Sequence, residues 1–252
     1  MPPPRPGGRP PKHPRRELVD AMLYVLRSGE AWRLLPHDLP PWQTVYHYFR
    51  LWRRDGTWER VNAALRERTR LRAGREATPS AAILDSQSAK TTEKGGPRGY
   101  DGGKKVSGRK RHILVDTGGL LLAARVHPAD VADRDGAKPL LAPLGRRFPR
   151  LTKLWADAAY QGPCAAWITE ALGWEVEITR RPRTWVRCPA DQAPPPRPGG
   201  FQVLPRRWVV ERTFAWLGRH RRLSKDYEAL PETEEAWIYL AMSRLMAARL
   251  AR

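Results

Sequence analysis

The chain has 252 residues, and its 46 Lys and Arg outnumber its 26 Asp and Glu, which gives a formal net charge of +20. An apolar content of 41% with eleven tryptophans supports a sizeable core and excludes wholesale disorder, which requires low hydrophobicity. Two cysteines exclude a disulfide-framed mini-protein, and the sequence shows neither a signal peptide nor an apolar run of about 18 residues. We therefore expect a soluble cytoplasmic protein with no membrane association, whose positive charge favours nucleic acid as its partner.

Residues 1–78 predict a small all-helical domain. Apolar residues recur at helical spacing in Glu17–Arg27 and Gln43–Arg54, with a proline-rich turn between them, and an arginine-dense third helix follows at 58–71. The second helix is amphipathic and carries Arg50, Arg53 and Arg54 on its polar side. This pattern is typical of a helix-turn-helix DNA-binding unit, and a plain three-helix bundle with a solvated face fits it equally well.

Residues 79–252 predict an α/β layer domain. The segments alternate as strand, hairpin, helix, strand, helix, strand and helix, at 80–86, 108–127, 134–148, 151–160, 164–172, 174–178 and 206–222. That order indicates a mixed sheet with helices packed on its faces. A proline- and glycine-rich stretch at 188–200 interrupts the domain and is expected to be an exposed insertion.

Three carboxylates form the candidate site. Two predicted strands end in Asp85 and Asp157, and ligands of open α/β sheets gather at the carboxyl ends of strands. Glu211 lies in the middle of the last predicted helix, beside Arg207. Three carboxylates brought together repel unless a cation joins them, and such oxygen ligands suit Mg²⁺ or Mn²⁺. The spacing alone fits two turn residues and a surface ion pair between Arg207 and Glu211 more readily than a metal site.

A basic, glycine-rich segment connects the first strand to the hairpin. Lys90–Arg111 contains eight basic residues and six glycines, and glycine lets a backbone approach a phosphate closely while Lys and Arg neutralise it. We expect this segment to contact DNA, with a flexible solvated loop as the alternative. The candidate contacts are Lys90, Lys104, Lys105, Arg109, Lys110 and Arg111. His112 and His127, which flank the hairpin, are expected to be structural.

Four stretches carry a family resemblance across nearly the whole chain. They are RSGEAWRLLPHDLPPWQTVYHYFRLWRRDGTWERV (27–61), ILDSQSAKTTEKGGPRGYDGGKKVSGRKRHILVDTGGLL (83–121), LWADAAYQG (154–162) and RRWVVERTFAWLGRHRRLSKDYE (206–228). Together they resemble the DDE transposases of bacterial insertion sequences, in the group named after insertion sequence five. The resemblance implies a ribonuclease-H-like core, in which the first and fourth strands are adjacent.

The resemblance also implies roles for the three acids. Asp85, Asp157 and Glu211 match the three catalytic carboxylates, which would bind two Mg²⁺ or Mn²⁺ ions for strand cleavage and for transesterification into target DNA. The helical region would recognise terminal inverted repeats, and a homodimer would hold both ends in the nucleoid of a bacterial cell. A decayed, non-catalytic DNA-binding repressor and a nuclease that hydrolyses without joining are the alternatives.

The chain departs from the family pattern at two ends. The C-terminal signature has a tyrosine upstream of Arg207 and a basic residue seven positions after the glutamate, whereas positions 204 and 218 hold leucine and glycine. Arg219 or Arg222 would then be the basic residue of this signature, and we expect both of them and Arg207 to contact DNA. Relatives usually begin with a further helix before the proline-rich start, so the resemblance implies a truncated or misassigned start of the helical region.

Overall fold

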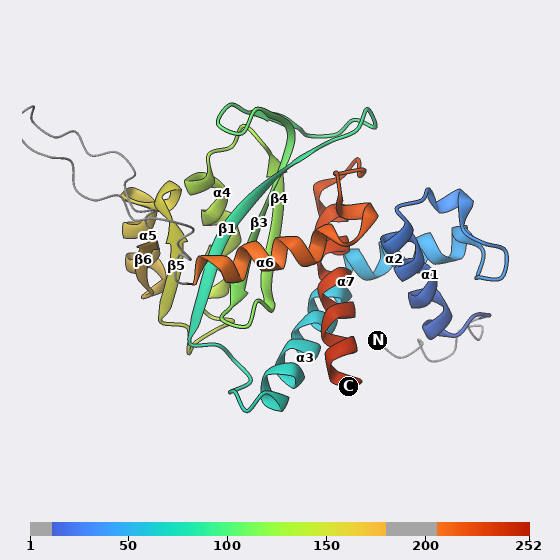
Figure 1. Ribbon diagram of the computed structural model, residues 1–252, viewed down its shortest axis with the longest axis horizontal. Coiled ribbons are helices and arrows are strands. Elements are labelled where there is room, and N and C mark those ends of the chain that lie inside the picture. Colours follow the sequence, from blue (N-terminus) through green and yellow to red (C-terminus); the bar gives the residue numbers. More distant parts are fainter. Residues whose placement is uncertain (1–11, 180–205) are drawn as a thin grey trace, which may run out of the picture.

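A mixed six-stranded sheet forms the centre of the computed structural model, which describes residues 12–179 and 206–252 (Figure 1). The predicted insertion at 188–200 and Leu204 lie outside the described residues. The strand order is β2-β3-β1-β5-β6, with β4 paired to β3. The strands are β1 (Ala81–Lys90), β2 (Gly99–Asp101), β3 (Val106–Asp116), β4 (Leu121–Pro128), β5 (Lys153–Asp157) and β6 (Glu175–Thr179).

The strand pairing confirms the predicted fold class. Strand β1 pairs antiparallel with β3 and parallel with β5, and β5 pairs parallel with β6. When the three-residue β2 is left aside, β5 is the fourth strand and lies directly beside the first. This adjacency is the one that a ribonuclease-H-like core requires.

Helices cover both faces of the sheet. They are α1 (Arg15–Ser28), α2 (Trp42–Arg54), α3 (Thr57–Arg72), α4 (Asp133–Leu141), α5 (Pro163–Leu172), α6 (Arg207–Gly218) and α7 (Pro231–Leu250). Because side chains alternate along a strand, Ala82 and Leu84 enter the core on the side of α4 and α5, while Ile83 enters the core that includes α6 and α7. In Figure 1, α6 runs across β1.

The N-terminal helices share a core with the rest of the chain. Trp237 of α7 stacks on Phe49 of α2 with ring centroids 4.2 Å apart and on Trp32 at 5.4 Å. Helix α3 packs against α7 and β4. Residues 29–41 separate α1 from α2, a longer link than the three or four residues of a helix-turn-helix. The helix-turn-helix interpretation and the boundary at residue 78 therefore remain predictions.

Helix α7 is the one long element that the sequence patterns did not predict. Ten of its residues are buried, and they include the unbroken run from Ala236 to Ser243, so it lacks the polar face of an amphipathic helix. Its position between the sheet and α1 and α2 explains why this run is buried on every side of the helix (Figure 1). No helix in the described parts of the chain is both long and apolar enough to cross a bilayer.

Candidate active site

Parallel pairing of β1 and β5 places Asp85 and Asp157 near one another. Ile83 pairs with Trp155 in a parallel register, and each aspartate lies two residues further along its strand. Both aspartates occur at odd positions and so point to the side of α6. The prediction that β1 ends at Asp85 is wrong, since β1 continues along β3 to Lys90. Asp85 nevertheless lies just beyond the last pair between β1 and β5, where a side chain from either strand becomes accessible.

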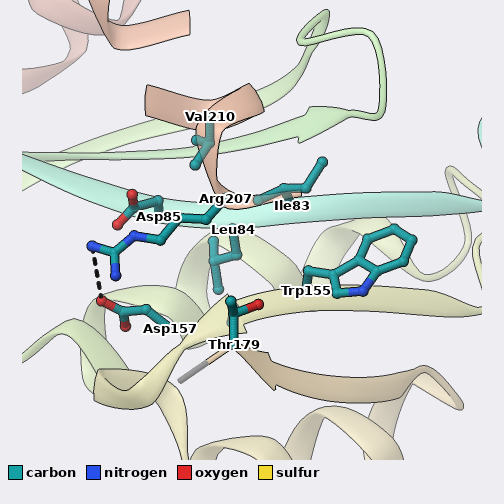
Figure 2. Close-up of a pocket in the computed structure, with 9 residues that line it drawn as sticks. Ile83, Leu84, Asp85, Trp155, Asp157, Thr179, Arg207 and Val210 are labelled. Atoms are coloured by element: carbon teal, nitrogen blue, oxygen red, sulfur yellow. Dashed lines mark ion pairs between the residues drawn. The ribbon is translucent and has the colours of Figure 1, made fainter. Parts of the chain in front are cut away.

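The two aspartates border a pocket that Arg207 closes from the helix side (Figure 2). The Arg207 guanidinium reaches down from α6, and its Nη2 lies 4.0 Å from Oδ2 of Asp157. The pocket is lined by Ile83, Leu84, Asp85, Trp155, Ala156, Asp157, Thr179, Arg207 and Val210. One carboxylate on each of two neighbouring strands, with the Arg207 cation between them and the helix, is therefore the core of the site.

Burial changes the acidity of the Asp85 carboxyl group. Its removal from water and, to a lesser extent, the neighbouring charge of Asp157 raise the pKa of Asp85 to about 6. A hydrogen bond from the Ser86 backbone N–H, 2.7 Å from Oδ1, opposes that shift, as do the charges of Arg207 and Lys104. The ionised form of Asp85 thus depends on nearby positive charge.

Glu211 is held apart from the aspartate pair. Its side chain is 55% exposed and forms an ion pair with Nε of Arg207, one helical turn earlier, at 3.1 Å. No group of three or more His, Cys, Asp and Glu in the described residues is arranged to hold a metal ion. The structure thus brings two of the three predicted ligands together, and Arg207 joins the third to them through its charge.

Two arginines predicted to contact DNA are buried instead. Arg109 donates hydrogen bonds to Oδ2 of Asp226 at 2.8 Å and to the Glu228 carbonyl at 2.7 Å, and it has no exposed surface. Arg111 forms an ion pair with the buried Glu234 and donates to the Leu223 carbonyl at 2.8 Å. The prediction fails for both because β3 lies between β1 and β4, and the C-terminal segment covers this part of it with carboxylates.

The predicted DNA contacts of Lys110 and Arg222 are also wrong, because both side chains are buried against partners within the protein. Lys110 Nζ lies 3.1 Å from Asp133 and donates to the Val131 carbonyl at 2.9 Å. Arg222 lies 2.6 Å from Oε1 of Glu228 and is 4% exposed, so it is unavailable for the basic role of the C-terminal signature. Among the described candidates for that role, Arg219 is exposed at the end of α6.

The remaining predicted contacts lie on the surface or close to it. Arg53 is partly buried and donates to Thr233 of α7. The exposed ones are Lys90, Lys104, Lys105, Arg50, Arg54 and Arg219. For two of the six glycines the structure shows a contact within the protein, since a Cβ on Gly99 would lie 2.0 Å from Oδ1 of Asp130 and a Cβ on Gly108 would lie 2.0 Å from the Ala89 carbonyl oxygen. These two glycines permit close packing within the protein.

A buried polar network lies behind the aspartate pair, on the α4 side of the sheet. Ser86, next to Asp85, donates to Oδ1 of Asp133 at 2.9 Å. His112 and His127 stack with centroids 4.8 Å apart, and burial lowers the pKa of His112 to about 3, which supports the expected structural role of the pair. Asp133, at the start of α4, therefore connects this network to the serine that follows Asp85.

Comparisons with known proteins match two family models to this chain. The family model described as "Transposase DDE domain" matches residues 76–246, and one described as "Putative transposase of IS4/5 family" matches residues 1–62. The putative transposase for insertion sequence element IS402 of Burkholderia cepacia is 30% identical over 140 residues, which are 53% of this chain and 60% of that protein. The chain thus spans about three fifths of that relative.

One solved structure is also similar, the Mos1 transposase paired-end complex with the left transposon end. It is 17% identical, with a TM-score of 0.25 over 68% of this chain and 60% of that one. The family model alone covers more than half of the chain, from just before β1 to Met246 near the end of α7, and includes all three predicted carboxylates. The chain therefore belongs to the family of the transposase DDE domain.

Proposed function

We propose that this protein is a DNA transposase that cuts the ends of an insertion sequence and joins them to target DNA. The observation that carries the proposal is the placement of Asp85 and Asp157 beside each other, on adjacent parallel strands and under α6, inside a chain of the DDE family. The site supports phosphodiester chemistry because paired carboxylates bind the divalent ions that such reactions use.

The donors at the site fit a hard divalent cation. Asp85 accepts one backbone hydrogen bond from Ser86 and Asp157 one from Ala159, so each retains carboxylate oxygens for a metal. Mg²⁺ is usually held by one or two carboxylates plus water and substrate phosphates, so this pair is sufficient to begin a site. Bound Mg²⁺ or Mn²⁺, as two ions with Glu211 as a further ligand, would supply positive charge to the attacking and leaving oxygens.

The chain's own residues prepare this site. Arg207 offsets the charge of Asp157 and Glu211 and favours the ionised form of Asp85, which is the form that binds a cation. Lys104 and Lys105 are exposed in the turn between β2 and β3 and would neutralise phosphates of the entering duplex. The exposed Arg50 and Arg54 of α2 would contribute to recognition of the terminal inverted repeats, with a homodimer holding both ends.

Two assays on one pair of variants test the proposal. Duplex DNA from the borders of the element is incubated with Mg²⁺, and strand cleavage and strand transfer are scored separately. Asp85→Asn and Asp157→Asn should abolish both reactions but leave duplex binding nearly unchanged, because phosphate contacts supply the affinity. Glu170→Gln, which alters an exposed carboxylate on α5, is the matched control and should retain both.

The outcomes separate the three functions. Cleavage without joining of pre-cut ends would identify a nuclease, and end binding without either reaction would identify a repressor. If Asp85→Asn or Asp157→Asn cleaved DNA at the normal rate, that residue would have no role in the chemistry.

A further inference from the structure

A ladder of alternating aromatic and cationic side chains runs along α6. We refer to Trp208, Arg212 and Trp216 of α6, together with Arg249 of α7, as the α6 ladder. The Arg212 guanidinium carbon lies 4.5 Å from the ring centroid of Trp208 and 4.6 Å from that of Trp216, and Arg249 lies 4.7 Å from Trp216. Each distance is within the range of a cation–π contact, so the ladder is one continuous stack.

The ladder is exposed at the end nearest the aspartates. Trp208 is 45% exposed, and it is the only tryptophan among the exposed large hydrophobic residues of the described chain. It directly follows Arg207, which reaches Asp157. Trp216, eight residues further along α6 and therefore about 12 Å away, is half-buried. A molecule lying on Trp208 would consequently be next to the pocket.

The cations of the ladder are not neutralised by the described protein. Neither Arg212 nor Arg249 has a carboxylate within 4.0 Å in the described ranges, in contrast to Arg109, Arg111 and Arg222. Arg212 is fixed in place by a hydrogen bond to the Gly118 carbonyl at 3.0 Å. A rigid array with unpaired positive charge and an exposed ring matches an anionic partner that also has flat aromatic surfaces.

We propose that the α6 ladder binds an unpaired DNA strand beside the active site, with a base stacked on Trp208. The inference rests on the proposed function, and it adds a strand-binding surface to it. Duplex DNA offers phosphates and groove edges to a protein, whereas its base faces are stacked inside. Exposed aromatic rings interleaved with arginines are the means by which proteins hold single strands, because every base has a face that can stack.

The test compares two substitutions at Trp208 that differ in aromaticity. Binding of a fluorescent twelve-residue oligothymidine is measured by anisotropy at several salt concentrations. Trp208→Leu should weaken binding by about 5- to 100-fold, the range for loss of one stacked base, and Trp208→Phe should retain most of the affinity. The salt slope of Trp208→Leu should stay unchanged, because no charge is lost. Tyr24→Leu, on the similarly exposed Tyr24 of α1, is the control and should bind normally.

Further measurements distinguish a failure of the ladder proposal from a failure of the proposed function. Duplex binding by Trp208→Leu should remain within about twofold of the wild type, and ultraviolet cross-linking of a 5-iodouracil oligonucleotide should map to the Trp208 peptide. Equal oligothymidine affinity for wild type and Trp208→Leu would overturn the ladder proposal. If the wild-type protein did not bind duplex DNA at all, the proposed function would be overturned instead. If Trp208→Leu instead converted a dimer into a monomer, the surface would join two copies of the chain, and the proposal would be wrong.

Discussion

Arg109 provides the sharpest distinction between a buried structural cation and a DNA contact. Its guanidinium donates to Asp226, to the Glu228 and Ala229 carbonyls and, through Nε, to the Pro97 carbonyl at 2.6 Å. Arg109→Gln would leave the fully buried Asp226 carboxylate without its ion-pair partner. Removing one member of a buried pair costs about 3–5 kcal/mol, which for a chain of this size corresponds to a Tm lower by roughly 6–20 °C.

The assay pairs unfolding with DNA binding. Thermal and urea unfolding of Arg109→Gln are compared with those of Lys105→Gln, and duplex affinity is measured at a temperature where both variants are folded. Arg109→Gln should be strongly destabilised with nearly normal affinity, and Lys105→Gln should show the opposite. Replacing the pair together by Met and Leu should recover much of the lost stability, since apolar residues of similar volume often replace buried ion pairs without loss. A normal Tm combined with weakened duplex binding in Arg109→Gln would refute the reasoning.

Three further predictions follow from the structure. Changing both Lys104 and Lys105 to Gln should reduce the slope of log K against log salt by up to about 1.8 for duplex DNA. An unchanged slope in a salt titration would show that the β2–β3 turn makes no phosphate contact. Gly108→Ala should cost about 1–3 kcal/mol in urea unfolding because its Cβ would collide with the Ala89 carbonyl, whereas Gly102→Ala, which meets no atom within 4 Å, should not; equal effects would contradict the packing argument. Burial lowers the pKa of His112 to about 3, so below pH 6.5 the unfolded chain takes up this proton and the folded chain does not. Stability should therefore fall by up to about 2 kcal/mol between pH 6.5 and 5. His112→Gln should flatten that decline, and an unchanged decline in this variant would show that another group causes it.

The layer order and the aspartate pair were predictable because they follow from local patterns. The short apolar runs before Asp85 and Asp157 form strands, and the DTGG turn between two further apolar runs specifies a hairpin. The end of β1 was not predictable from the same pattern, since its last residues, SQSAK, are polar. They remain in the sheet because they pair with β3, as Lys90 does with Gly108.

The fate of the basic residues depended on contacts distant in the sequence. Arg109 and Arg111 look like phosphate ligands within their glycine-rich segment, and their partners Asp226 and Glu234 lie more than a hundred residues later. No local periodicity connects the two regions. Helix α7, which supplies Glu234, was itself missed because its unbroken buried run from Ala236 to Ser243 shows no helical periodicity. The missed helix and the wrongly assigned arginines therefore have one physical origin, which is packing between segments that are far apart in the sequence.

The position of Arg207 explains why the three acids do not meet. Two neighbouring aspartates, one of them largely buried, repel each other in the absence of a compensating cation. Arg207 provides that charge and, because Glu211 lies one helical turn further on, it holds the glutamate against its own Nε. A divalent cation between the aspartates would take over the compensation and leave Arg207 free for a phosphate oxygen. The same helix thus supplies a carboxylate, its counter-ion and, one residue later, the exposed Trp208, so that small movements of α6 would affect all three together.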